Sequence, residues 1–165
     1  MRPYQYATKS KAVQLRNVAT KGVFMRLGEI KAQALMLMGV NNNLDITWSD
    51  IEGYKDDPSY ATYIFAMNGS INRCLRRLYV AGAVKESPTS ISPTDEEATE
   101  ITAFASDIND TLAEIIPLYV VGDVFAMEEP SVAENRRNEF EALLEEYLNK
   151  VAFSAQDKVD IIYGV

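Results

Sequence analysis

Residues 109–151 read NDTLAEIIPLYVVGDVFAMEEPSVAENRRNEFEALLEEYLNKV, and this stretch decides the fold class. Its apolar residues recur three or four positions apart in two successive runs, which is the pattern of amphipathic helices. The first run begins between Asn109 and Thr111, and the second begins at residues 129–131. Because the connection at 128–130 is so short, we expect the two helices to pair antiparallel. The stripe of the second helix consists of Ala133, Arg137 (through its aliphatic stem), Phe140, Leu143, Leu144, Tyr147, Leu148 and Val151.

Both of these helices have signals for their first turns. The segments 111–114 (TLAE) and 131–134 (SVAE) have the form of a capping box, in which a hydroxyl and a glutamate satisfy free backbone N–H groups. Pro130 suits a first turn, where no intrahelical hydrogen bond is lost. Pro117 either falls in the first turns of its helix or kinks that helix.

Two more helices precede this pair. The pattern predicts one from Phe24 to Met38, with Lys31 contributing its aliphatic stem and Gly39 ending the helix. It predicts another from Ser59 to about Val80, ended by Gly82. The buried stripe of this second helix consists of Tyr60, Ile64, Met67, Ile71, Cys74, Leu75 and Leu78. We therefore expect an all-α protein, a four-helix-type bundle in which Cys74 is a buried thiol.

The remaining segments divide the chain around this bundle domain, which covers residues 24–151. Residues 1–23 form a basic N-terminal arm, and residues 152–165 no longer look helical and are expected to form an extended C-terminal tail. Residues 83–107 are a long loop for so small a domain, because loops beyond roughly 12–15 residues are uncommon without a function or hidden structure. Within it, residues 101–105 alternate with period two and predict a possible short strand or hairpin.

Composition excludes several kinds of chemistry. The 165 residues include no histidine and one cysteine, so neither a Ser–His–Asp set nor a Cys–His pair nor a Cys/His zinc site can be built from this chain. The phosphate-binding patterns GxxxxGK[ST] and GxGxxG are absent as well. We predict no catalytic, cofactor or metal site and no enzyme activity. The alternative of a carboxylate-only metal site would draw on Asp45, Asp50 and Glu52, which lack the EF-hand spacing.

Charge is distributed unevenly. The chain carries −8 overall, but residues 1–31 carry seven basic side chains and one acidic, and no basic residue lies between Lys85 and Arg136. The basic side chains of the arm are Arg2, Lys9, Lys11, Arg16 and Lys21. Such a segment is expected to contact the acidic surface of another chain, or DNA. The alternative function is therefore a small helical nucleic-acid-binding or regulatory protein that uses this arm.

The C-terminal segment is apolar. We predict that Ile161, Ile162, Tyr163 and Val165 bind a partner, because apolar surface at a chain end is costly to leave in water. The apolar runs are far shorter than the roughly 18 residues that a membrane helix needs, and residues 1–6 lack the apolar region of a signal peptide. No membrane association is expected.

Several short segments together carry a resemblance to a known family. In chain order they are LGEIKAQALMLMG (27–39), YKDDP (54–58), INR (71–73), IIPLYV (115–120), EEP (128–130), NRRNEFE (135–141) and VDIIYGV (159–165). Their order and spacing resemble those of the head–tail connector (adaptor, or head completion) proteins of tailed bacteriophages. The resemblance covers residues 24–165, and the 83–107 loop has no recognisable counterpart.

This resemblance implies a structural protein of the virion neck, made in the host cytoplasm. Such subunits form a homo-oligomeric ring, commonly of twelve, under the portal protein. The ring extends the channel through which the genome DNA passes without sequence-specific binding, and it docks neck or tail components such as stopper and tail terminator proteins. The loops and the C-terminal tail are then expected to reach neighbouring subunits or the portal.

Overall fold

The computed structural model describes residues 25–38, 51–53 and 56–163, without the side chains of residues 59, 60 and 156–163. Within these ranges the chain is mostly helical and has no strand beyond a single bridge between Arg26 and Glu100. The elements are α2 (Leu27–Met38), α4 (Pro58–Val80), the 3-10 helix η1 (Ile101–Ala103), α5 (Asp110–Val124) and α6 (Pro130–Tyr163). The prediction of an all-α bundle is confirmed.

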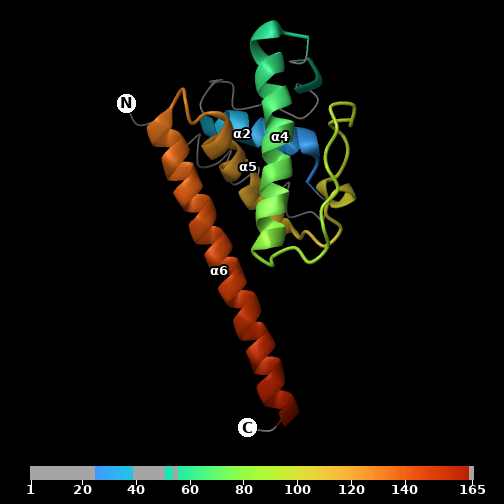
Figure 1. Cartoon of the computed structure of the whole chain (residues 1–165), viewed down its shortest axis with the longest axis vertical. Coiled ribbons are helices and arrows are strands. Elements are labelled where there is room, and N and C mark those ends of the chain that lie inside the picture. Colours follow the sequence, from blue (N-terminus) through green and yellow to red (C-terminus); the bar gives the residue numbers. More distant parts are fainter. Residues whose placement is uncertain (1–24, 39–50, 54–55, 164–165) are drawn as a thin grey trace, which may run out of the picture.

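The centre of the bundle is α5, which packs against α2, α4 and α6 (Figure 1). A helix that is apolar on all sides has to be covered on all sides. The segment 115–121 satisfies this condition, because every residue in it except the half-buried Tyr119 is buried. The apolar segment 115–121 therefore forms the axis around which the other helices are arranged.

The N-terminus of α5 differs from the prediction. Asn109, with extended backbone, is the N-cap, and its Oδ1 accepts a hydrogen bond from the backbone N–H of Leu112 at 3.0 Å. The capping box predicted at Thr111 is therefore wrong, because Thr111 already lies in the first turn and an asparagine caps at least as well as a threonine. Pro117 is the eighth residue of α5, in its interior, where a proline removes one intrahelical hydrogen bond.

The antiparallel pairing of α5 and α6 is evident from contacts at both ends. Near the start of α5, Asn109 Nδ2 donates to the hydroxyl of Tyr147 at 2.9 Å. Near its end, Arg137 Nη2 donates to the carbonyl oxygen of Gly122 at 2.6 Å. A Cβ at Gly122 would lie 3.1 Å from the carbonyl oxygen of Ala133, so this glycine permits the close approach. The helix α6 begins at Pro130, which places Ser131 inside the first turn and makes its predicted N-cap role wrong.

The prediction for α4 is confirmed in extent and in its buried face. Ile64, Met67, Ile71, Cys74, Leu75 and Leu78 are all buried, whereas the side chain of Tyr60 lies outside the described set. The helix ends at Val80, and Gly82 follows with a φ of +79°. The N–H of Ala83 donates to the carbonyl of Leu78 at 3.0 Å, a bond that this left-handed glycine makes possible.

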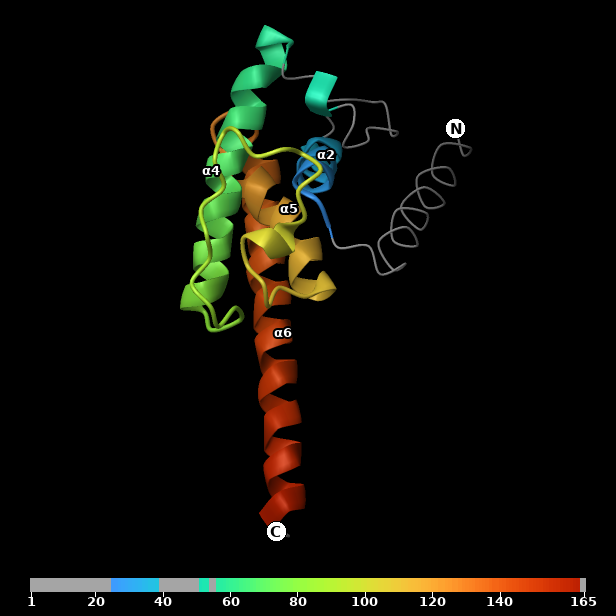
Figure 2. The same cartoon turned by 90° about the vertical axis from the view of Figure 1, so that its right-hand side faces the viewer.

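The 83–107 connection, here called the strap, is packed against the bundle. Figure 2 shows it running back along α4 before it passes α2. The side-chain amide of Asn72 fixes it by accepting from Ile91 N at 2.7 Å and donating to Ile91 O at 3.1 Å. Thr89 N also donates to Phe104 O at 2.8 Å. The strap is therefore a structural layer of the domain.

The strand predicted at residues 101–105 is wrong. Ile101, Phe104 and Ala105 are buried, and this i, i+3, i+4 spacing belongs to a helical turn. The N–H groups of Phe104 and Ala105 both donate to the carbonyl of Ile101, which closes the turn that forms η1. Packing of these three side chains outweighs the alternating sequence pattern.

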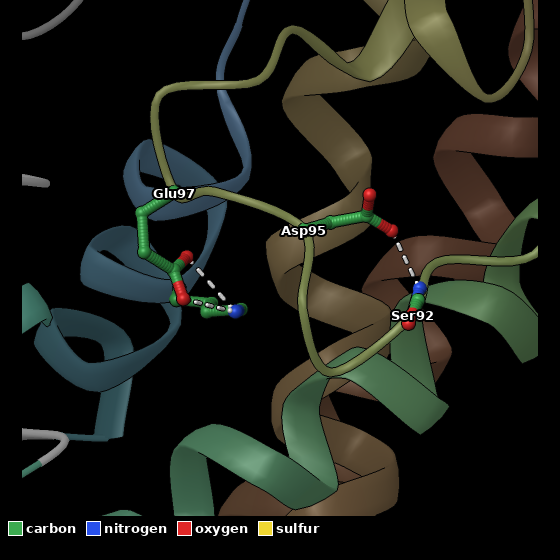
Figure 3. Close-up of polar contacts among 4 residues, drawn as sticks. Ser92, Asp95 and Glu97 are labelled. Carbon is green, nitrogen blue, oxygen red and sulfur yellow. Dashed lines mark hydrogen bonds and ion pairs between the residues drawn. The ribbon is translucent and has the colours of Figure 1, made fainter.

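A buried ion pair joins the strap to α2. Lys31 Nζ lies 2.8 and 2.9 Å from the two carboxylate oxygens of Glu97, and each side chain is only 1% exposed (Figure 3). The backbone continues this contact, because Gly28 N donates to Glu97 O at 2.9 Å and Leu27 N donates to Thr99 O at 3.0 Å. The first free N–H groups of α2 are thus satisfied by the strap.

The end of α6 corrects a further prediction. The helix continues to Tyr163, so the extended tail predicted for 152–165 is wrong over residues 152–163; residues 164–165 lie outside the described part. The physical reason is in the sequence, because residues 131–163 contain neither glycine nor proline to stop a helix. The predicted arm at 1–23 lies outside the described residues.

The ion pair makes a testable prediction about stability. Lys31→Met leaves the Glu97 carboxylate buried without its cation, and we expect the free energy of unfolding to fall by about 3–5 kcal/mol in urea denaturation. The double variant Lys31→Met/Glu97→Leu removes both charges and should recover most of that loss. A double variant no more stable than Lys31→Met would contradict this account.

Candidate interaction surface

The C-terminal part of α6 extends beyond the bundle. The bond between Asn109 and Tyr147 marks where α6 passes the start of α5, and residues 149–163 continue past that point. Both views show this segment, here called the projecting end, running away from every other described element (Figures 1 and 2). Residues 149–155 are exposed without exception, with Val151 49% and Phe153 73% exposed.

The projecting end continues an apolar stripe that packs against the bundle in the first half of α6. Phe140 and Leu144 are fully covered, Leu148 is half-buried, and Val151 at the next position on the same face is exposed. The sequence repeats the spacing at Ala155, Val159 and Ile162. This helix face is thus covered at Phe140 and Leu144 and exposed at Val151 and Ala155.

Such a segment has little within the chain to stabilise it. Helices shorter than about 12–15 residues are marginal in water, and most helix stability in proteins comes from tertiary packing. The projecting end is about 22 Å long at 1.5 Å per residue. One local contribution is the ion pair between Lys150 and Glu146 at 2.5 Å, one turn apart, which lowers the pKa of Glu146. This pair is exposed and screened by solvent.

A second exposed surface lies on the side of α4 that faces away from the core. Here called the outer face of α4, it is made of Thr62, Phe65, Arg73, Arg76, Tyr79 and Val80, all exposed. Phe65 is 65% and Val80 is 74% exposed. The whole of α4 contains three arginines and no acidic residue. The outer face is therefore partly apolar and positively charged.

The arginines of α4 differ in their contacts. Arg73 forms an ion pair with Asp123 at 2.5 Å, and Arg77 forms one with Glu141 at 2.8 Å. Arg76 has no hydrogen bond or ion pair to any described residue. It lines a pocket of about 140 Å³ between α4 and the strap. The other residues that line this pocket are Asn72, Arg73, Leu75, Pro88, Thr89 and Ser90.

None of the residues predicted to bind a partner has its side chain among those that the structure describes. Ile161, Ile162 and Tyr163 belong to the last turn of α6, without described side chains, and Val165 lies outside the described residues. The basic side chains Arg2, Lys9, Lys11, Arg16 and Lys21 lie outside them as well. The arginines of α4 are expected from the sequence to lie away from its buried stripe, but the apolar part of the outer face was missed, although Phe65 and Val80 also fall off that stripe.

No reactive site is evident among the described residues. Cys74 is fully buried, as predicted, and burial raises the pKa of its thiol, so the sulfur stays protonated and unreactive. The described residues include no group of three acidic, cysteine or histidine side chains that could hold a metal ion. Of the three carboxylates considered for a cation, Asp45 and Asp50 lie outside the described part and Glu52 is exposed.

Comparison with known proteins leaves the question of family open. No protein-family model, no curated protein and no solved structure matches this chain. In the part of the chain that the structure describes, no helix has both the length and the apolar character needed to cross a bilayer. Function therefore has to be argued from the exposed surfaces themselves.

The two halves of the α6 stripe can be compared directly by mutation. Leu144→Ala opens a cavity in the covered half, and we expect a loss of about 2–5 kcal/mol in the free energy of unfolding. Val151→Ala changes the uncovered half, and its effect should stay within about 0.5 kcal/mol. Urea denaturation of dilute protein measures both. A large loss for Val151→Ala under these conditions would mean that its own bundle covers the projecting end.

Proposed function

We propose that this protein is a structural subunit of the tailed-phage virion neck, a head–tail connector that forms a ring under the portal. The observation that carries the proposal is the projecting end of α6, an apolar helix face with no partner among the described residues. A well-packed bundle with such a projection is suited to joining other chains. The resemblance of residues 24–165 to connector proteins supports the same function.

The bundle suits a mechanical role. The strap is tied to α2 by the buried pair of Lys31 and Glu97 and to α4 by Asn72, so three segments distant in sequence form one core. Because α6 is packed on α5 over its first half, a load at the projecting end reaches the core of the bundle. A connector has to hold its shape against such loads.

Charge is compatible with a DNA channel. Between residues 86 and 135 there is no basic side chain, and many acids in this part are exposed. The exposed acids of this part include Glu86, Glu96, Glu100, Asp107, Asp110, Glu114, Glu128, Glu129 and Glu134. A like-charged surface repels the phosphates of DNA and keeps a passing duplex from adhering.

Deletion of residues 152–165 tests the proposal. The truncated protein should remain a folded monomer, because residues 152–155 are exposed and the projecting end leads away from the bundle (Figure 1), and we expect its unfolding free energy to change by less than about 1 kcal/mol. It should fail to attach to the portal, and particles carrying it should lose DNA and fail to join tails. Truncated particles that retain their DNA and join tails would exclude this function for the C-terminal segment.

A salt titration separates the connector from the alternative of a nucleic-acid-binding protein that uses the basic arm. If the protein is a connector, the isolated chain should bind duplex DNA weakly or not at all. The alternative predicts measurable binding. The logarithm of its association constant should fall linearly with the logarithm of salt concentration, with a slope of about −0.9 for each phosphate contacted. Removing residues 1–23 is the matched control, because only the alternative requires those residues for DNA binding.

A further inference from the structure

We propose that the projecting end of α6 docks on the outer face of α4 in a second copy of this chain, so that copies associate head to tail. This inference rests on the proposed ring and names the contact between its neighbouring subunits. It commits to two surfaces that differ in position, shape and charge. The outer face of α4 and residues 149–155 of the projecting end are exposed within the chain that carries them.

The projecting end needs a partner outside its own chain. The face that it presents is continuous with the face that α5 covers, through Phe140, Leu144 and Leu148 to the exposed Val151. In Figure 1 the projecting end runs beyond the C-terminal end of α4 and away from it. It therefore does not cover the α4 of its own bundle, whereas a neighbour can bring its own α4 alongside.

The outer face of α4 offers a matching apolar surface. Phe65 and Val80 lie at its two ends and belong to the most exposed large apolar side chains of the described residues. At about 34 Å, the 23 residues of α4 are longer than the projecting end, so one helix can lie along the other. Contact between the two would bury Val151 of one copy against apolar side chains of the next.

Charge favours this pairing over a pairing of two outer faces of α4. The helix α4 contains three arginines and no acid, and Arg73 and Arg77 are paired with acids of their own chain, so Arg76 leaves the outer face with an uncompensated positive charge. The projecting end itself has two lysines and two aspartates and no net charge, but Glu145 and Glu146 directly precede it and bring residues 145–163 to a net charge of −2. Two outer faces of α4 therefore repel each other, whereas an outer face attracts the acids at the base of the projecting end. Arg76, which has no partner among the described residues, is the arginine most available to a carboxylate from a neighbouring copy.

The symmetry of this contact has a consequence. A contact between two different surfaces leaves one of each free at the ends of any open assembly, so subunits add until a ring closes or a filament grows. A contact between two projecting ends would be satisfied in a dimer and stop there. Docking of the projecting end on the outer face of α4 therefore predicts an assembly larger than a dimer.

Charge reversal on the full-length protein tests the contact, with mass measured by light scattering over a range of concentrations. Wild-type protein should form species larger than a dimer. Arg76→Glu and Glu145→Lys should each weaken association at least about tenfold, and the two combined in one chain should restore it in part, because the pair is then reversed. Arg136→Glu, at the opposite end of α6, carries the same charge change as Arg76→Glu and serves as the control. All three positions are on the surface, so circular dichroism should show unchanged folding.

Each other result overturns the inference. Assembly that stops at a dimer indicates contact between identical surfaces. Assembly insensitive to Arg76→Glu, or equally sensitive to Arg136→Glu, places the contact elsewhere. A chain that stays monomeric at every concentration excludes head-to-tail contact between free copies. None of these results removes the proposed function, which fails separately if particles lacking residues 152–165 keep their DNA and join tails.

Discussion

The ion pair between Lys31 and Glu97 is the interaction on which the arrangement of the domain depends. It joins residues 66 positions apart, and it is almost fully withdrawn from water. Two buried charges are tolerated only when they are well paired, so the strap has one acceptable position against α2. That position also places the Glu97 and Thr99 carbonyls on the first N–H groups of α2 and brings Ile101 into the core. A connection that looks like a loose loop in composition is thereby fixed as part of the fold.

The helix α5 supplies the second constraint, because its segment 115–121 is apolar around the whole circumference and requires neighbours on every side. The helices α2, α4 and α6 provide them. Gly122 and Arg137 set how closely α6 approaches, since the glycine leaves room for the backbone and its carbonyl receives the arginine. Covering α5 uses only the first half of α6. The second half is free of the bundle for the simple reason that α6 is more than twice as long as α5.

Much of this fold follows from local sequence pattern, and the exceptions have physical causes. The extents of α4, α5 and the start of α6 could be predicted because apolar spacing and helix-breaking residues are local signals. The role of Lys31 could not, because the partner that makes its burial acceptable lies far away in a segment without regular spacing. The turn at Ile101 was misassigned because tertiary burial of Phe104 outweighs an alternating pattern. Among the surfaces, the apolar C-terminal segment was visible in the sequence, but its helical form and the exposure of the outer face of α4 depend on which faces the bundle covers.

The stripe of α6 contributes to the core of the bundle along one half of the helix, and in the proposed assembly its other half contacts another chain. If the uncovered half were replaced by polar residues, the bundle would keep Phe140 and Leu144 and lose nothing that holds α5 in place. Exposed apolar side chains such as Val151 and Phe153 therefore contribute nothing to the core that would explain their presence. They do make the free chain less soluble, a cost that a contact with another chain offsets. Because the helix is continuous, that contact is held at a fixed direction from the bundle, which is what a subunit needs if its neighbours are to be placed in a regular assembly.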